Sequence, residues 1–235
     1  RRPGHAPQKH LLLPQTRHGH DPQTGGMRRI RPAHSGKEIM ADNGDILIPY
    51  PLEILTDRLA LRSPAFSHAE PLCEAVVESF SELHPWMPWA QEEPSVEKTA
   101  ENIRKAIDEF KAQTAIRIHV FDRKTGQIVG SSGYPRVDLA VPNVEIGYWI
   151  RTSRTRRGIC RETVRALTRY AMETLRVQRV EIRCDNDNER SWRVAERVGF
   201  TLEGILRRNC LDCRGRPRNT RVYSMLPDEW ATKQQ

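Results

Sequence analysis

Apolar residues recur along the chain with two distinct periods from about residue 52 onward. Between 96 and 110 they lie three and four positions apart, as on one face of a helix, and Ser95 directly before this stretch is a good N-cap. Between 116 and 121 apolar and polar residues alternate, which is typical of a half-buried strand. By the same criteria the sequence predicts further helices over 67–79, with Ser67 as N-cap, 162–175 and 191–198, and strands over 59–62, 128–134, 144–150, 177–184, 200–206 and 220–226.

The order of these elements predicts the fold class. From residue 144 onward strands and helices alternate as in a βαβ unit, whereas 116–134 is typical of a hairpin around the turn at 124–126. We therefore expect an α/β (α+β) fold, with a mixed central sheet of about six to seven strands flanked by helices. Residues 47–231 would form this single domain, followed by a short C-terminal tail at 232–235.

Residues 1–46 differ from the rest in composition. They hold five of the eight histidines, many Pro and Gly residues and almost no apolar periodicity, so they cannot bury enough surface to offset the entropy of ordering. We expect a disordered or non-native N-terminal tail, with Met27 and Met40 as candidate start residues. His18 and His20 lack the second ligand pair that a zinc site needs.

Composition argues against membrane and disulfide-rich classes of protein. No apolar run approaches the roughly 18 residues that a membrane span needs, and we expect no secretory leader. The five cysteines are odd in number and irregularly spaced, unlike a disulfide scaffold. Cys210 and Cys213 form a single Cys-x-x-Cys pair without the matching pair of a zinc site. We expect a cytoplasmic protein with no metal and no membrane partner.

The net charge of +8 is concentrated in one part of the chain. Residues 151–222 contain 19 Arg, no Lys and nine acidic residues, whereas residues 47–150 are acidic overall. Because the guanidinium group binds phosphate and carboxylate groups with a planar fork, this block predicts a surface that contacts phosphates or an acidic partner. Solvated arginines without a partner are the alternative, and the pattern does not indicate specific DNA binding.

The stretch from Glu145 to Glu162 carries the most informative chemical pattern. A strand runs into a short loop containing Gly158 and then directly into a helix, with arginines at 154, 156, 157 and 161. Backbone N–H groups at such a helix N-terminus favour an anion. The loop lacks both Gly-Lys-Ser/Thr and Gly-x-Gly-x-x-Gly, so it is neither a Walker loop nor a dinucleotide loop. These residues predict a pyrophosphate site, and a turn with an exposed Arg-rich shoulder is the alternative.

Several motifs, in one order along the chain, resemble those of the GNAT N-acetyltransferases. They are Thr56–Arg62, the tryptophans of Leu83–Trp89, the strand and loop at 145–160, Arg183–Ser191 and Val194–Gly204. The resemblance covers about residues 52–230 and is specific to the ribosomal-protein alpha-N-acetyltransferase (RimJ/RimL-like) branch. It implies the GNAT fold with a βαβ cofactor-binding core, acetyl-CoA as cosubstrate, and a homodimer, which family members often form.

The resemblance also implies which residues bind acetyl-CoA. The family's Gln/Arg-x-x-Gly-x-Gly/Ala loop falls on 155–160, where Gly158 matches while Thr155 and Cys160 depart from the pattern. The strand before the loop would pair with the pantetheine through its backbone, with Asn188 near the pantetheine and Ser191 next to the sulfur. The implied contacts are Tyr148, Trp149, Ile150, Arg151, Arg156, Arg157, Gly158, Ile159, Cys160, Arg161, Asn188 and Ser191.

Acetyl transfer by direct attack in a ternary complex needs a neutral amine, a stabilised oxyanion and a proton for the departing thiolate. Glu145 is the first candidate for the base, with a purely structural carboxylate as the alternative. Glu203 is the second candidate, and some relatives of the branch carry a carboxylate near the position of Cys210. Ser191 is the candidate proton donor, or else a hydroxyl that serves the helix N-terminus. The family's oxyanion donor is a backbone N–H within 145–150.

The acceptor amine is the least constrained part of the prediction. The resemblance implies that Trp86 and Trp89 line the acceptor pocket, although tryptophans flanked by proline also pin loops onto a core. A protein N-terminal α-amine is the expected acceptor, with a small amine or an antibiotic as the alternative. A function of another class is a non-catalytic fold of this family whose basic face binds RNA or the ribosome.

Overall fold

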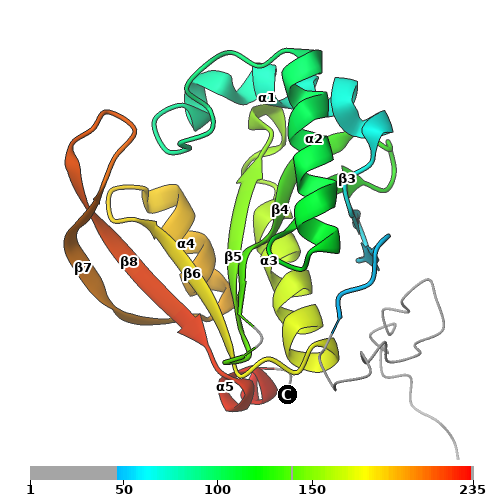
Figure 1. The fold of residues 1–235 in the computed structure, drawn as a ribbon. Coiled ribbons are helices and arrows are strands. Elements are labelled where there is room, and N and C mark those ends of the chain that lie inside the picture. The colour runs from blue at the N-terminus through cyan, green and yellow to red at the C-terminus, as the bar shows by residue number, and fades with distance from the viewer. Residues whose placement is uncertain (1–46, 139, 234–235) are drawn as a thin grey trace, which may run out of the picture.

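One mixed sheet of eight strands organises the computed structural model, which describes residues 47–138 and 140–233 (Figure 1). Its strands are β1 (Glu53–Leu55), β2 (Leu59–Arg62), β3 (Ile116–Asp122), β4 (Ile128–Asp138), β5 (Asn143–Ile150), β6 (Arg179–Asp185), β7 (Thr201–Leu211) and β8 (Pro217–Met225). The helices are α1 (Ala69–Leu83), α2 (Val96–Lys111), α3 (Ile159–Arg169), α4 (Glu189–Val198) and α5 (Pro227–Thr232). Short turns of other helix types occupy Phe66–His68, Thr152–Arg154 and Tyr170–Thr174.

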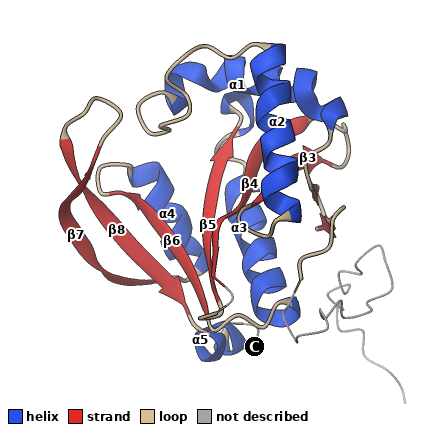
Figure 2. Cartoon of the chain, in the orientation of Figure 1, coloured by secondary structure: helices blue, strands red, loops and turns tan. Residues whose placement is uncertain are grey.

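The strand order is β1-β2-β3-β4-β5-β6-β8-β7, and β5 with β6 is its one parallel pair. Helices α1 and α2 cover one face of the sheet and α3 and α4 the other (Figure 2). The larger core lies on the α3 face, where Val144, Ile146 and Leu167 are almost completely buried. A smaller core under α1 and α2 contains Leu72 and Ile103. The predicted mixed α/β class is confirmed; the sheet has eight strands instead of the expected six to seven, and the short β1 is one that the sequence did not predict.

The N-terminus of α2 agrees with the sequence, whereas those of α1 and α3 differ from it. The side chain of Ser95 accepts the N–H of Lys98 and caps α2 as expected. Ser67 was the wrong N-cap for α1, because it lies inside a 3₁₀ turn and His68 precedes the helix. Helix α3 begins at Ile159 rather than near 162, because Gly158 at its N-cap adopts φ 75° and starts the helix earlier.

Two expectations concern residues that the structure does not describe. The N-terminal tail at 1–46, with its His18/His20 pair and the candidate starts Met27 and Met40, lies outside the described residues. So do the last two residues of the predicted C-terminal tail. Within the described part of the chain, no helix combines the length and apolar character that crossing a bilayer requires.

Candidate functional site

The parallel pairing of β5 with β6 stops partway along both strands. It consists of Asn143 with Arg179, Val144 with Val180 and Glu145 with Glu181, after which the strands diverge (Figure 1). On its other edge β5 stays paired with β4 as far as Ile150. Backbone donors on the β6 side of β5 are therefore left without a strand partner.

The orientation of these donors follows from the bond at the end of β5. The N–H of Arg151 donates to the carbonyl of Val129 in β4, at 2.9 Å. Successive N–H groups of a strand point to opposite sides. The N–H groups of Tyr148 and Ile150 therefore point away from β4, into the space that β6 has vacated, where a ligand can accept them.

A glycine loop lies directly after this strand. Arg156 and Gly158 adopt positive φ values of 59° and 75°, and the first bond of α3 runs from the N–H of Glu162 to the carbonyl of Gly158 at 3.0 Å. The N–H groups of the first turn, at 159–161, consequently have no acceptor within the helix and carry the positive end of its dipole. A Cβ on Gly158 would have only one neighbour within 4 Å, a guanidinium nitrogen of Arg58 at 3.6 Å, so the loop surface is open. This geometry suits an anion.

The arginines around the loop fall into two groups. Arg154 turns away from it and donates to Oε1 of Gln127 at 2.6 Å. Arg156, Arg157 and Arg161 are exposed and, among the described residues, form no ion pair with a carboxylate. Their charge is therefore available to a bound anion.

Helix α1 fixes the beginning of the loop. Arg151 is buried and its Nε lies 2.5 Å from Oε2 of Glu78, while the N–H of Ser153 donates to the other carboxylate oxygen at 2.9 Å. The N–H of Thr152 donates to the hydroxyl of Ser79 at 3.0 Å. The side chain of Arg151 is thereby committed to α1, so its predicted part in ligand binding concerns its backbone.

Ser191 and Tyr148 form a pair of hydroxyls where β5 and β6 diverge. Ser191 Oγ donates to the Tyr148 hydroxyl at 3.3 Å, and that hydroxyl donates to the Ser191 carbonyl at 2.9 Å. Burial raises the pKa of Tyr148 well above its usual value. Asn188 caps α4, because its Oδ1 accepts the N–H of Ser191 at 3.1 Å. The sequence had assigned Tyr148 only a backbone contact, and this hydroxyl pair carries no local sequence signal.

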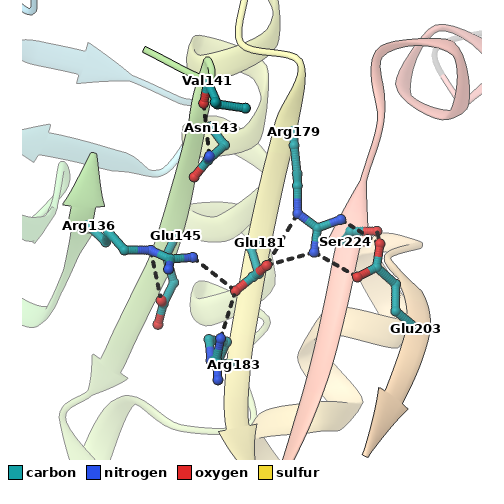
Figure 3. Close-up of polar contacts among 9 residues, drawn as sticks. All are labelled: Arg136, Val141, Asn143, Glu145, Arg179, Glu181, Arg183, Glu203 and Ser224. Carbon is teal, nitrogen blue, oxygen red and sulfur yellow. Dashed lines mark hydrogen bonds and ion pairs between the residues drawn. The ribbon is translucent and has the colours of Figure 1, made fainter. Parts of the chain in front are cut away.

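Glu145 lies on the opposite face of the sheet from that pair, since odd and even positions of a strand point to opposite faces. Arg136 bridges two carboxylates there (Figure 3), with its Nε 3.7 Å from Glu145 Oε2 and its NH2 3.1 Å from Glu181 Oε1. Glu181 also contacts Arg179 at 2.6 Å and Arg183 at 3.5 Å. Burial raises the pKa of Glu145, against the opposing charges of Arg136 and Arg183.

Glu203 has a different environment. Arg179 donates hydrogen bonds to both of its carboxylate oxygens, and Ser224 Oγ donates to Oε1 at 2.7 Å. The hydrogen bonds from Arg179 and Ser224 lower the pKa of Glu203 to about 2. A carboxylate so strongly stabilised as the anion is a weak proton acceptor, which disfavours Glu203 as a base.

The two tryptophans after α1 lie in different places. Trp86 is 38% exposed and, with Pro85, forms one wall of a cavity of about 450 Å³. The other lining residues come from the end of β6, the loop after it and the β7–β8 hairpin, and they include Asp185, Asp187, Asp212, Arg214, Arg216 and Arg218. Trp89 does not line this cavity; its ring centroid lies 6.1 Å from that of Trp149.

Cys210 lies beside the same hairpin wall. Its Sγ accepts a hydrogen bond from Nε of Arg218 at 3.1 Å, and Arg218 also pairs with Asp185 at 3.4 Å. In residues 47–138 and 140–233, no cluster of three or more His, Cys, Asp or Glu side chains is arranged to hold a metal ion.

Comparisons with known proteins agree with this architecture. Residues 58–201 match the family described as acetyltransferase (GNAT) domain. The chain is 28% identical over 153 residues to the ribosomal-protein-serine acetyltransferase of Escherichia coli (strain K12), covering 65% of this chain and 84% of that protein. It is 30% identical over 178 residues to the putative ribosomal N-acetyltransferase YdaF of Bacillus subtilis (strain 168), covering 75% and 95%. The solved structure of RimL, a ribosomal L7/L12 alpha-N-protein acetyltransferase in complex with coenzyme A, is 26% identical, with a TM-score of 0.68 and coverage of 74% and 97%.

Proposed function

Because the chain belongs to the GNAT acetyltransferase family, we propose that it acetylates the α-amine of a polypeptide N-terminus. It is an acyltransferase with acetyl-CoA as cosubstrate. The family leaves the acceptor open. The names of the E. coli and B. subtilis relatives support a ribosomal-protein type of acceptor.

One observation carries the assignment of the site. The pairing of β5 and β6 ends at Glu145, and the unpaired remainder of β5 leads into the loop at the α3 N-terminus. The free N–H groups of the strand and those of the helix therefore follow one another along the chain. The backbone of Tyr148 and Ile150 would hold the pantetheine. The first-turn N–H groups at 159–161, with Arg156 and Arg157, would hold the pyrophosphate.

The departures of the loop from the family pattern are compatible with this assignment. Cys160 packs against the main hydrophobic core, and burial raises the pKa of its thiol to about 12. Its side chain is therefore directed into the protein, and its backbone N–H stays available at the helix N-terminus. Thr155 is exposed, with its hydroxyl donating to the carbonyl of Thr152 at 2.9 Å, so it too leaves the loop open.

The chemistry is divided between the two faces of the sheet. Glu145, with its raised pKa, would take the proton of the acceptor amine. A backbone N–H of β5 on the vacated side would stabilise the oxyanion of the tetrahedral intermediate. The hydroxyls of Ser191 and Tyr148, on the other face, would supply the proton to the leaving thiolate. Both are protonated at neutral pH, as a proton donor must be.

The acceptor would enter through the cavity between Trp86 and the β7–β8 hairpin. Exposed arginines of this hairpin at 207, 208 and 214 have no carboxylate partner among the described side chains. They would contact acidic groups of the polypeptide or ribosomal partner that presents the amine.

An acceptor panel tests the proposal. Peptides that begin with Ser, Ala or Met are incubated with acetyl-CoA, beside the same peptides with a blocked α-amine and a set of small amines including aminoglycosides. Thiol release and a mass gain located on the α-amine are expected only with the free peptides. Turnover with small amines and none with any peptide would replace the proposal by its small-amine alternative.

A further inference from the structure

The turn between β1 and β2 reaches across the molecule to the start of α3. Thr56 Oγ1 donates to Oε1 of Glu162 at 2.5 Å, and Arg58 Nε donates to Oε2 at 2.7 Å. The N–H of Arg58 adds a longer bond to Oε1 at 3.3 Å. Both oxygens of one carboxylate in the first turn of α3 are thus held by a segment more than a hundred residues earlier.

The same guanidinium also holds the loop before the helix. Its NH1 donates to the carbonyl of Arg157 at 3.0 Å, and its NH2 is the nearest neighbour that a Cβ on Gly158 would meet. Arg58 therefore spans Gly158, with one contact before it and one after it. A planar fork with fixed directions is suited to such a double contact.

The turn between β1 and β2 is itself held in place by Arg123. Arg123, directly after β3, donates from Nη1 to the carbonyl of Thr56 at 2.5 Å, and its N–H donates to the carbonyl of Arg58 at 2.9 Å. The turn that carries Thr56 and Arg58 is thereby attached to the β3–β4 hairpin, so its position does not depend on the loop that Arg58 holds.

The ion pair between Arg58 and Glu162 also affects the charge at the helix N-terminus. A carboxylate in the first turn stabilises a helix N-terminus, but it repels any other anion that approaches the same N–H groups. Arg58 NH2 lies 2.5 Å from Glu162 Oε2, so the carboxylate is neutralised at the place where a phosphate would bind. Removal of Arg58 would both free the loop and expose this negative charge.

We infer that Arg58, supported by Thr56, is a positioning residue for acetyl-CoA: it holds the loop at 155–158 open and cancels the charge of Glu162 beside the pyrophosphate. The inference rests on the proposed placement of acetyl-CoA at this loop. Arg58 acts through Glu162 and the Arg157 carbonyl, and its effect is on donor affinity and not on the chemical step.

Calorimetric titration with CoA tests the inference on the full chain. Arg58→Ala should weaken CoA binding about tenfold, the scale of one lost set of charge-assisted hydrogen bonds. Arg58→Lys, which keeps the charge but not the fork, should fall between Arg58→Ala and wild type. Arg62→Ala is the matched control, because Arg62 is at the far end of β2 from the turn that holds Arg58, and it pairs with Glu53 at 2.7 Å away from the loop. Its CoA affinity should equal that of wild type.

A comparison of donors separates positioning from general damage. With acetyl-CoA, Arg58→Ala should raise KM about tenfold at unchanged kcat, whereas with S-acetylpantetheine, which lacks the phosphates, it should match wild type. Equal CoA affinity in wild type and Arg58→Ala, or an equal loss with both donors, would overturn the inference. A wild-type protein that binds no CoA would instead refute the placement of acetyl-CoA on which the inference rests.

Discussion

Glu145 and Glu203 are strand carboxylates at two ends of one network of charges, and their surroundings distinguish them. Glu145 is raised in pKa by burial and keeps only a 3.7 Å contact with Arg136, whose closer partner is Glu181. Glu203 is gripped by Arg179 and its pKa lies near 2. The arginines of the network thus make their closest contacts with Glu181 and Glu203, and Glu145 is a stronger base than Glu203.

Glu145→Gln should therefore lower kcat about a hundredfold, the usual contribution of a positioned base, with little change in CoA affinity. Steady-state kinetics and CoA titration measure both quantities. Glu203→Gln is the matched control, because it removes a carboxylate from the same network without removing the base. Equal kcat values for wild type and Glu145→Gln would remove Glu145 from the mechanism.

Arg136→Met should shift the acidic limb of the pH–rate profile to higher pH. The base must be ionised, so the rate falls as pH drops through the pKa of Glu145, which already lies above its usual value. Arg136 lowers that pKa, and its removal lets the pKa rise further. A limb that stays in place, or moves to lower pH, would show that Glu145 does not control it.

At the scale of elements, local signals predicted most of the fold. Helix α2 was predicted closely because both its period and its Ser95 cap are local. Strand β7 runs to Leu211, well beyond its predicted end at 206. The prediction ended too early because the second half of the strand is exposed and its sequence does not alternate between apolar and polar residues. The Gly158 loop was found from sequence, since strand, glycine and helix adjoin. The contact of Arg58 with Glu162 could not be found, because nothing local records a partner 104 positions away.

Helix α4 depends on its cap for the position of Ser191. Asn188→Ala should lower the free energy of unfolding by about 1 kcal/mol, because the N–H of Ser191 loses its acceptor. Asn188→Asp should stay close to wild type, since Asp caps equally well and its charge suits a helix N-terminus. Urea denaturation of the three proteins compares them, and similar losses in both variants would contradict capping as the source of the effect.

At the scale of the whole molecule, the arginine block serves two purposes. Arg179 and Arg183 surround the buried carboxylate of Glu181 and stabilise the sheet. Arg156, Arg157 and Arg161 instead gather, without carboxylate partners among the described residues, at one helix terminus. Sequence composition could not separate these groups, because it does not show that Arg179 also binds Glu203 of β7, 24 positions away.

A pair of histidines, of which His119 is fully buried and His68 is half-buried, gives the molecule a pH-dependent stability. His119 is fully buried, its Nδ1 lies 2.9 Å from Nδ1 of His68, and its Nε2 has no hydrogen-bond partner among the residues that the structure describes. The Ala65 N–H already donates to His68 Nδ1 at 3.2 Å, so His119 is the donor in the pair and a second proton would be buried on its Nε2. Burial, followed by the charges of His68 and Arg117, lowers the pKa of His119 to about 3.

The unfolded chain therefore binds one more proton than the folded one between pH 3 and pH 6.5. Stability is full above that window and falls as pH drops, by about 2 kcal/mol between pH 7 and pH 5 for this one group. Urea denaturation at the two values measures the loss. His119→Leu should remove most of this dependence, and a variant with the same slope as wild type would exclude His119 as its cause.

The proposed function requires that the loop around Gly158 hold the phosphates of acetyl-CoA. Calorimetric titration of CoA into wild type and Gly158→Asp tests it most directly, because the variant puts a carboxylate where the pyrophosphate would lie. We predict one CoA per chain in wild type and at least a tenfold weaker affinity in Gly158→Asp, with unfolding measured in parallel to confirm that the variant is folded. A folded variant that binds CoA as tightly as wild type would contradict the account.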